Sequence, residues 1–273
     1  MTGDEQEILA AAERDLMGDI DTTVPHSARI WNYWLGGKDY FPVDQAAGDD
    51  YTAVYPAIVD LARASRAFLG RAVRHLAGEC GVRQFLDVGT GLPTEGNTHE
   101  VAQGVAPGSH IVYVDNDPLV LVHARALLTS RPEGATHYIE ADLHVPKDIA
   151  ERAAEHLDFS RPVALMLMGI LGHVNDDAEA RSIVAQLLEP LPSGSYLVLY
   201  DGTATDQAFL EAQQGYDETG AVPYRLRHPD QIRSFFTGLE LLEPGVVPLQ
   251  QWRPDASGDH GEVDAYCGVG RKP

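Results

Sequence analysis

The stretch that decides the fold is QFLDVGTGLPTEGN, from Gln84 to Asn97. It begins with a mostly apolar run, Phe85 to Val88, which a glycine-spaced turn, Gly89-Thr90-Gly91, follows. Glycine has no Cβ, so its backbone can take positive φ and a ligand can approach it closely. The polar segment after the turn is typical of a helix start, where free N–H groups would point towards that ligand. We therefore expect a strand, a ligand-binding turn and a helix here.

Three strand-like runs carry a carboxylate at or near their ends. Asp87 lies in the first run, Asp115 follows HIVYV at 110–114, and Asp142 follows the run at 137–140. Asp115 stands 24 residues after Gly91, near the ~20-residue offset at which an acid in nucleotide-binding βαβ units reaches the ribose hydroxyls. Each acid could instead cap the next helix. Three acids at three strand ends favour ligand binding over capping.

The composition disfavours several classes of protein. The formal charge of −21, from 41 acidic and 20 basic residues, disfavours nucleic acid as a partner. No run of eighteen apolar residues occurs, and the acidic N-terminus does not resemble a signal peptide, so we expect a soluble cytoplasmic protein without a membrane partner. Cys80 and Cys267 lack ligand spacing. The acidic cluster at 255–262 is typical of a solvated loop, and we expect no metal site.

From residue 84 onwards, apolar runs alternate with helical patterns. We predict strands at 84–88, 110–114, 136–140, 162–168 and 195–200, and helices at 95–104, 118–130, 147–156, 177–189 and 204–215. This alternation requires an α/β fold with a doubly wound, mostly parallel sheet. Two further strands, 239–249 and 262–271, would form an antiparallel hairpin at the sheet edge.

The segment before residue 80 reads as helical. A thin apolar stripe predicts a helix over residues 1 to about 20, and residues 49–80 hold one or two more. Between them, Ser27 could cap a helix that ends at Gly36-Gly37. One face of that helix would carry Trp31, Trp34 and Leu35, and another Arg29, Asn32 and Tyr33. From spacing alone, packing on the sheet is favoured over closure above a ligand.

The fourth strand-like run ends in GILGH, which places His173 near a strand end. If this strand lies beside the first one, His173 comes close to Gly89 and Gly91. It is then a candidate base, although a lone His beside a loop is more often a hydrogen-bonded structural residue.

Four segments together resemble a known family. HSARIWNYWLGGKDYF, FLDVGTGLPTEGNTHEVAQ, VYVDNDPLVLVHARALL and YIEADL are similar to bacterial S-adenosyl methyltransferases of the Rossmann-like class I. The resemblance covers nearly the whole chain after residue 20. It implies a seven-stranded sheet of order 3-2-1-4-5-7-6 in a methyltransferase domain at 81–273. Residues 1–80 would form a helical extension or lid in the same compact unit.

The resemblance also implies roles for individual residues around S-adenosylmethionine. Its methionine part would be wrapped by Asp87, Gly89, Thr90 and Gly91, and its ribose would be bound by Asp115. The adenine would be contacted by Asn116, Asp142 and Leu143. The route to the methyl group would be lined by Met168 and Gly169. The segment from Arg29 to Lys38 would act as a lid. Pro93 stands near the position of a third glycine found in many methyltransferases, and the lost N–H donor would be replaced by Thr94 or Arg29.

The acceptor is expected to be a small molecule, bound between residues 29–41, 169–173 and 202–228. A base is needed only if the nucleophile carries a proton, and His173 and Tyr33 are the candidates. Two alternatives stay open: a non-catalytic S-adenosylmethionine-binding protein, and a nicotinamide oxidoreductase, whose fingerprint wants glycine or alanine at Thr94. The sequence does not distinguish a monomer from a homodimer.

Overall fold

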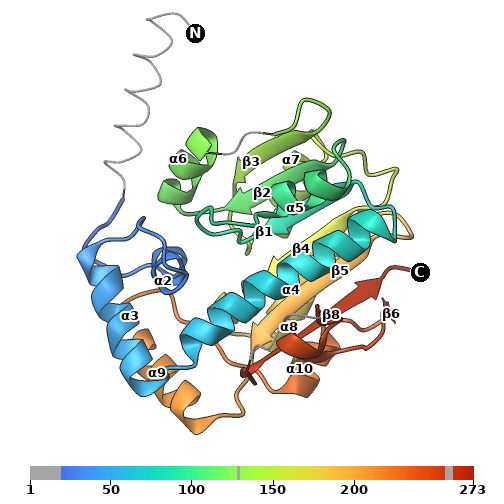
Figure 1. Ribbon diagram of the computed structural model, residues 1–273. Helices are drawn as coiled ribbons and strands as arrows, with labels where there is room; N and C mark the ends of the chain where they lie inside the picture. The colour runs from blue at the N-terminus through green and yellow to red at the C-terminus, as the bar shows by residue number, and fades with distance from the viewer. Residues whose placement is uncertain (1–19, 128–129, 256–260) are drawn as a thin grey trace, which may run out of the picture.

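The computed structural model describes residues 20–127, 130–255 and 261–273 (Figure 1). The helix expected near the N-terminus lies outside these ranges, as do Asp259 and His260 of the acidic loop.

The centre of the fold is one mixed sheet. Its strands are β1 (Gln84–Val88), β2 (His110–Asp115), β3 (Ala135–Glu140), β4 (Ala164–Met168), β5 (Tyr196–Gly202), β6 (Glu240–Leu241), β7 (Val247–Pro248) and β8 (Ala265–Arg271). The order is β3-β2-β1-β4-β5-β8-β6, and β7 also pairs with β8. The first five strands are parallel, and β8 runs antiparallel to β5. The expected order is 3-2-1-4-5-7-6, in which the last strand of the chain lies between the fifth and sixth strands. The position of β8 between β5 and β6 confirms this order.

The strand predicted at 239–249 is wrong in length. Only β6 and β7 form there, two residues each, and both pair with β8. Pro244, and Gly245 with φ of 91°, lie between them. Proline cannot donate a hydrogen bond to a ladder and glycine at positive φ turns the chain, so a continuous strand cannot form.

The helices cover both faces of the sheet. They are α2 (Ser27–Trp34), α3 (Pro42–Val54), α4 (Ile58–Gly78), α5 (Thr98–Val105), α6 (Pro118–Leu127), α7 (Pro146–Ala153), α8 (Asp177–Leu188), α9 (Gln207–Asp217) and α10 (Pro229–Ser234), with 3₁₀ turns η1 (Leu171–His173) and η2 (Leu249–Gln251). In β1, Phe85 packs in the core cluster that contains the side chains of α4 and α5. Its neighbour Leu86 packs in the cluster that contains those of α7 and α8. This alternation confirms the doubly wound arrangement, because successive side chains of a strand point to opposite faces.

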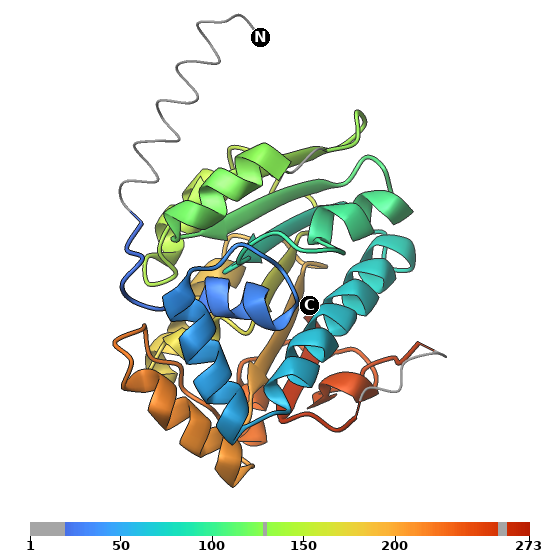
Figure 2. The ribbon, with the colours of Figure 1, turned by 60° about the vertical axis from the view of Figure 1, so that its left-hand side comes forward.

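Three helices lie beyond the carboxyl ends of the parallel strands. Figures 1 and 2 show α2, α3 and α9 together at that edge, with α2 across the strand ends. The cap of α2 is His26 rather than Ser27, since the His26 ring accepts a hydrogen bond from the amide of Ala28 at 3.3 Å. His26 Nδ1 also lies 3.1 Å from Asp117 Oδ2, just after β2. This contact places the start of α2 next to the edge of the sheet where the acids lie.

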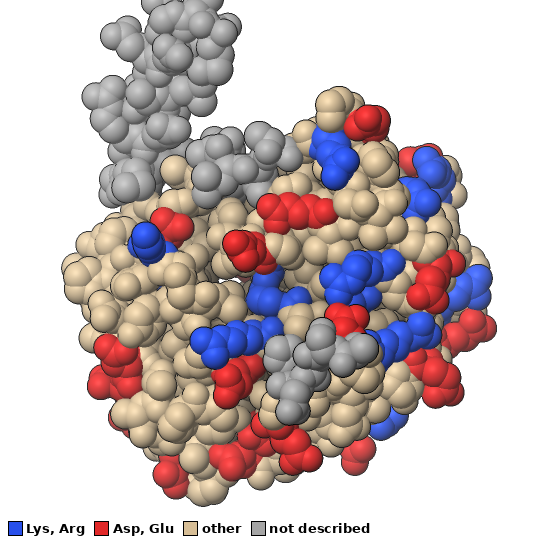
Figure 3. All heavy atoms as spheres, in the orientation of Figure 1, with Lys and Arg blue, Asp and Glu red and all other residues tan. Residues whose placement is uncertain are grey.

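The acidic excess does not produce a uniform surface. On the face shown in Figure 3, Lys and Arg side chains lie among Asp and Glu side chains. Within the described residues, no helix is both long enough and apolar enough to cross a membrane.

Candidate functional site

A cavity of about 400 Å³ lies at the carboxyl ends of β1, β2, β4 and β5, next to α2. Its lining includes most residues that the sequence singled out: Asp87, Gly89, Thr90, Gly91, Thr94, Asp115, Asn116, Asp142, Leu143, Met168, Gly169 and His173. The sheet order explains this gathering, since β1 lies between β2 and β4 at the point where the winding reverses. Ligands of doubly wound sheets bind at such reversal points.

The turn after β1 needs its glycines. Gly89 and Gly91 have φ of 73° and 66°, which residues with a Cβ rarely adopt. A Cβ at Gly89 would lie 2.4 Å from Ile170 Cγ1, whereas a Cβ at Gly91 would meet no atom within 4 Å. Gly89 is therefore required for packing against the turn after β4, and Gly91 leaves open space on the cavity side.

Asp115 is tied to that turn. Its Oδ2 accepts a hydrogen bond from the amide of Gly91 at 2.8 Å, and its Oδ1 accepts one from the amide of Asp117 at 3.0 Å. Burial raises the pKa of Asp115, and these two bonds oppose the rise. Each carboxylate oxygen can accept a second bond, so Asp115 retains acceptor capacity at the cavity.

Asp142 is the most exposed of the three acids. Its Oδ1 accepts a hydrogen bond from the amide of His144 at 2.9 Å and lies 2.9 Å from His144 Nδ1. These bonds lower the pKa of Asp142, so its carboxyl group is an anion at neutral pH.

Asp87 is buried and only half paired. Its Oδ2 accepts a hydrogen bond from Thr98 Oγ1 at 2.6 Å, while Oδ1 has no partner within the part of the chain that the structure describes. Burial raises the pKa of Asp87 to about 6, against the effects of the Thr98 bond and the nearby charge of Arg66. An unpaired buried acceptor costs stability unless a ligand satisfies it.

Arg66, from α4, is the one Lys or Arg side chain among the described residues that line the cavity. Its Nη2 donates long bonds to the carbonyl of Glu95 at 3.3 Å and to Asn97 Oδ1 at 3.4 Å. Its Nε is buried without a partner, and so is Thr94 Oγ1, again counting described residues only. Two hydrogen-bonding groups are thus available in the lining of the cavity, and the charge of Arg66 lies near the Asp87 carboxylate.

His173, in η1, has a defined tautomer. Its Nδ1 lies 3.0 Å from the carbonyl oxygen of Pro223, and because a carbonyl only accepts, Nδ1 must carry the proton. Burial lowers the pKa of His173, so the ring is neutral at pH 7 with a free lone pair on Nε2. Such a group can accept a proton.

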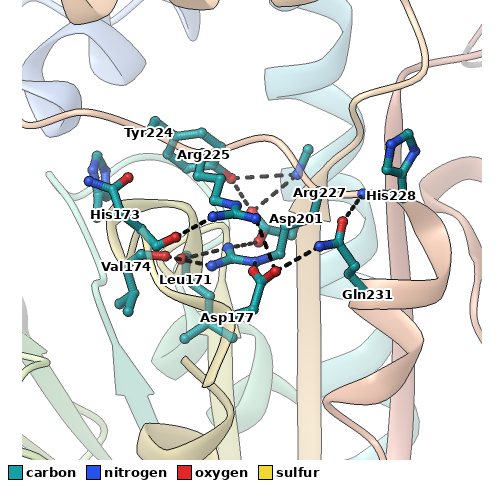
Figure 4. A network of polar contacts seen from close by, with 12 residues as sticks. Leu171, His173, Val174, Asp177, Asp201, Tyr224, Arg225, Arg227, His228 and Gln231 are labelled. Atoms are coloured by element: carbon teal, nitrogen blue, oxygen red, sulfur yellow. Dashed lines mark hydrogen bonds and ion pairs between the residues drawn. The ribbon is translucent and has the colours of Figure 1, made fainter. Parts of the chain in front are cut away.

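Buried Arg227 holds the His173 turn against β5 (Figure 4). Its guanidinium donates to the carbonyls of Leu171 at 2.8 Å and Val174 at 2.5 Å, on either side of His173. It also pairs with Asp201 Oδ2 at 3.0 Å, and both of these side chains are completely buried. The turn is therefore fixed by charge-assisted bonds as well as by packing.

Three residues that the sequence placed in the site do not line this cavity. The Arg29 guanidinium donates instead to the carbonyls of Asp21 and Val24, at 3.1 and 3.3 Å. Tyr33 donates to Asp49 Oδ1 at 2.6 Å, and Lys38 is exposed. The helical period turns Arg29 and Tyr33 away from the strand ends, and the opposite face of α2 meets the cavity. Lys38 lies beyond the end of α2 at Trp34.

Other lining residues were not recognised as functional from the sequence. Trp31 and Trp34 had the spacing of core residues, yet both line the cavity. Arg66 lies in a helix whose pattern is that of an ordinary amphipathic helix. Tyr200 lines the cavity from β5 and Tyr224 from the loop after α9, and no local pattern marks them. Within the described residues, no group of three or more His, Cys, Asp or Glu could hold a metal ion.

Comparisons with known proteins agree with this geometry. The family model of S-adenosyl methyltransferases matches residues 13–273. A DUF574 family protein of Streptomyces avermitilis is 48% identical over 93% of this chain and 99% of its own, with a TM-score of 0.89. A proposed methyltransferase of Thermobifida fusca is 39% identical over 92% of this chain and 96% of its own, with a TM-score of 0.85.

A more distant structure, a SAM-dependent methyltransferase of Anabaena variabilis, is 14% identical over 93% of this chain and 96% of its own, with a TM-score of 0.51. It shares the fold alone. A search among curated proteins gave no match. The family match spans the glycine turn, the three acids and all strands of the sheet, and this chain therefore belongs to the S-adenosyl methyltransferase family.

Proposed function

We propose that this protein binds S-adenosylmethionine in the cavity at the strand ends and transfers its methyl group to a small molecule. The observation that supports this most is the gathering of the glycine turn, Asp87, Asp115 and Arg66 around one cavity. Family membership supports the type of reaction, and the geometry supports the residues.

The unpaired polar atoms fit the amino acid end of this cofactor, which carries an ammonium group and a carboxylate. Asp87 Oδ1 is an acceptor for the ammonium group, and Arg66 Nε and Thr94 Oγ1 are donors for the carboxylate. Pro93 removes one backbone donor from the turn. We assign its replacement to Arg66 with Thr94, in place of Arg29, which contacts other groups.

The adenosine end fits the acids of β2 and β3. Asp115 would accept hydrogen bonds from the ribose hydroxyls with the acceptor positions that Gly91 and Asp117 leave free. Asn116, Asp142 and Leu143 would surround the adenine.

The reaction needs a positioned acceptor and the exclusion of water. When bound, the cofactor supplies a methyl group on a positively charged sulfur. Met168 ends β4 at the cavity, and Gly169 follows it. A Cβ at Gly169 would lie 2.7 Å from Tyr200 Oη, so only glycine fits at this position of the wall. His173 Nε2 would take the proton of a protonated nucleophile. Tyr33 is not retained as a base because it faces Asp49.

Calorimetry with S-adenosylmethionine, S-adenosylhomocysteine and NAD⁺ tests the proposal. We expect the first two to bind, NAD⁺ not to bind, and Asp115→Ala to lower the affinity at least about 100-fold, because charge-assisted bonds are lost. Asp49→Ala, which changes an exposed acid outside the cavity lining, is the matched control. Binding of NAD⁺ alone would instead identify an oxidoreductase. Binding of S-adenosylmethionine without methyl transfer to any acceptor would indicate a regulator.

A further inference from the structure

The half of the cavity away from the strand ends is lined by rings. We call this part the aromatic chamber and define it by six residues: Trp31, Trp34, Tyr51, Phe209, Tyr216 and Tyr224. The first five are connected by edge-to-face contacts. The ring centroids lie 5.6 Å apart for Trp31–Trp34 and 5.2 Å for Trp34–Tyr51, and Tyr51 lies 6.3 Å from Tyr216 and 6.4 Å from Phe209.

The aromatic chamber contains no formal charge. Among the described residues, those that α2, α3, α9 and the loop 218–228 contribute to the cavity include no Asp, Glu, Lys or Arg. Gln213, a neutral polar group there, accepts from Tyr51 Oη at 3.1 Å and donates to Asp217 Oδ1 at 2.8 Å. A charged ligand would lose its hydration in the chamber without a charged side chain to pair with, and the attraction of a cation to the ring faces is smaller than that loss. An uncharged ring would instead add to the edge-to-face contacts already present.

The chamber reaches His173 through Tyr224. The two rings are 5.2 Å apart at 88°, and Tyr224 Oη donates to buried Asp201, which Arg227 also binds (Figure 4). A Cβ at Gly172 would lie 2.2 Å from the Tyr224 ring, so the ring packs directly on the turn that carries His173. The ring of a methyl acceptor bound in the chamber would therefore have the fixed, neutral imidazole of His173 beside it.

The basicity of His173 selects the kind of nucleophile. Because burial lowers its pKa, His173 is a weak base, and the cost of moving a proton to it grows with the pKa of the group that gives the proton up. A ring hydroxyl has a pKa of about 10, compared with about 15.7 for water. A ring hydroxyl is therefore a better match than an aliphatic one.

We propose that the methyl acceptor is an uncharged, flat aromatic compound and that a hydroxyl on its ring is methylated. The inference rests on the proposed function and narrows it to a substrate class. The hydroxyl oxygen forms the new bond to the methyl carbon, the sulfur keeps the electron pair of the bond that breaks, and the hydroxyl proton passes to His173 Nε2.

Binding of four matched probes to protein saturated with S-adenosylhomocysteine tests the substrate class. The probes are 2-naphthol, the anion 2-naphthoate, the cation 2-(aminomethyl)naphthalene and the non-planar decahydro-2-naphthol. We expect 2-naphthol to bind at least about tenfold tighter than each of the others, since each lacks neutrality or flatness. Equal or tighter binding of any other probe overturns the proposal. Failure of S-adenosylhomocysteine to bind in the first step would instead contradict the proposed function.

The variant Trp31→Leu locates the probe. Trp31 is partly exposed, so Trp31→Leu should fold, and we expect it to weaken 2-naphthol binding about three- to tenfold through the lost ring contact. Unchanged 2-naphthol affinity in Trp31→Leu would place the probe elsewhere and overturn the chamber as its site.

His173→Asn keeps a donor for the Pro223 carbonyl and removes Nε2. We expect unchanged binding of 2-naphthol and of S-adenosylhomocysteine, and a transfer rate about 100- to 10,000-fold lower. His156→Asn, which changes a His outside the cavity lining, is the control. In the native protein, the rate should rise with pH to a plateau reached near neutrality. In His173→Asn, it should keep rising until the hydroxyl itself ionises. An identical pH profile in both, or tight binding of 2-naphthol without transfer, overturns the assigned chemistry.

Discussion

The backbone amide of Gly91 donates to Asp115 Oδ2 over 2.8 Å, although 24 residues separate them in the chain. The loop after β1 and the acid at the end of β2 therefore form one unit, in which the ribose-binding carboxylate that we propose also fixes the glycine turn. The roles of the two glycines of that turn can be distinguished by substitution with alanine, because the added Cβ would meet different surroundings at Gly89 and at Gly91.

Gly89→Ala should destabilise the protein. The new Cβ would lie 2.4 Å from Ile170 Cγ1 at a φ of 73°, so we expect a loss of about 2–4 kcal/mol from overpacking and backbone strain together. Urea unfolding followed by circular dichroism measures it. A loss below about 0.5 kcal/mol, the range of ordinary surface substitutions, would contradict the packing described here.

Gly91→Ala is the matched variant at the other glycine. A Cβ there meets no atom within 4 Å, so the fold should lose only about 1 kcal/mol, the cost of a left-handed residue. Affinity for S-adenosylhomocysteine should nevertheless fall at least about tenfold, because the Cβ occupies the space through which a ligand approaches the backbone. Calorimetry that found native affinity would exclude close contact at Gly91.

Arg66→Met tests the carboxylate contact. We expect the affinity for S-adenosylhomocysteine to fall about 10- to 100-fold, the usual effect of losing hydrogen bonds to a charged group. Affinity for 5′-methylthioadenosine, which lacks the amino acid end, should stay within about twofold of the native value, since no carboxylate is present to be bound. Arg63→Met, an exposed arginine on the same helix, is the control. Equal losses for both ligands would mean that Arg66 acts on the fold.

Arg227→Met should be strongly destabilising. It removes a fully buried guanidinium that pairs with Asp201 at 3.0 Å and with Asp177 at 3.0 Å, and breaking a buried pair typically costs about 3–5 kcal/mol. Arg225→Met removes a half-exposed arginine that also contacts Asp177 and should cost less than about 1 kcal/mol. Chemical denaturation of both variants gives the comparison, and similar losses would refute the role of Arg227.

The buried carboxyl of Asp87 predicts a pH-dependent stability. Its pKa is raised from 3.8 to about 6, so the folded state binds the proton more tightly than the unfolded state. The stabilisation of the folded state by this proton is fully present below pH 3.8 and is lost as pH rises through about 6. The free energy of unfolding therefore falls by about 3 kcal/mol over this range.

Asp87→Asn removes this titration. Compared with the native protein, the variant should lose less stability between pH 4.5 and pH 7.5, while its affinity for S-adenosylhomocysteine falls because a neutral amide attracts an ammonium group less. Unfolding curves at both pH values provide the measurement. Parallel losses in the two proteins would show that Asp87 does not titrate in this range.

Local sequence patterns were sufficient for the five parallel strands and their acids, whereas the full order of the sheet came from the family resemblance. The continuous apolar run of β4 and the turn after β1 are short-range features, and strand alternation with helices leaves few possible topologies. Asp87, Asp115 and Asp142 were found because each belongs to a strand end, and parallel strands deliver their ends to one edge. The split of 239–249 into β6 and β7 could have been suspected from Pro244 and Gly245.

The chain alone therefore determined which residues form the parallel strands and which acids gather at their ends, because hydrophobic period and turn chemistry act over a few residues. The tertiary structure decided which face of α2 meets the cavity, and so replaced Arg29 and Tyr33 with Trp31 and Trp34. It also brought Arg66 to Asp87 and Tyr224 to His173, across 21 and 51 positions of sequence. These contacts depend on how whole helices and loops pack on the sheet, and no local pattern of residues encodes that packing.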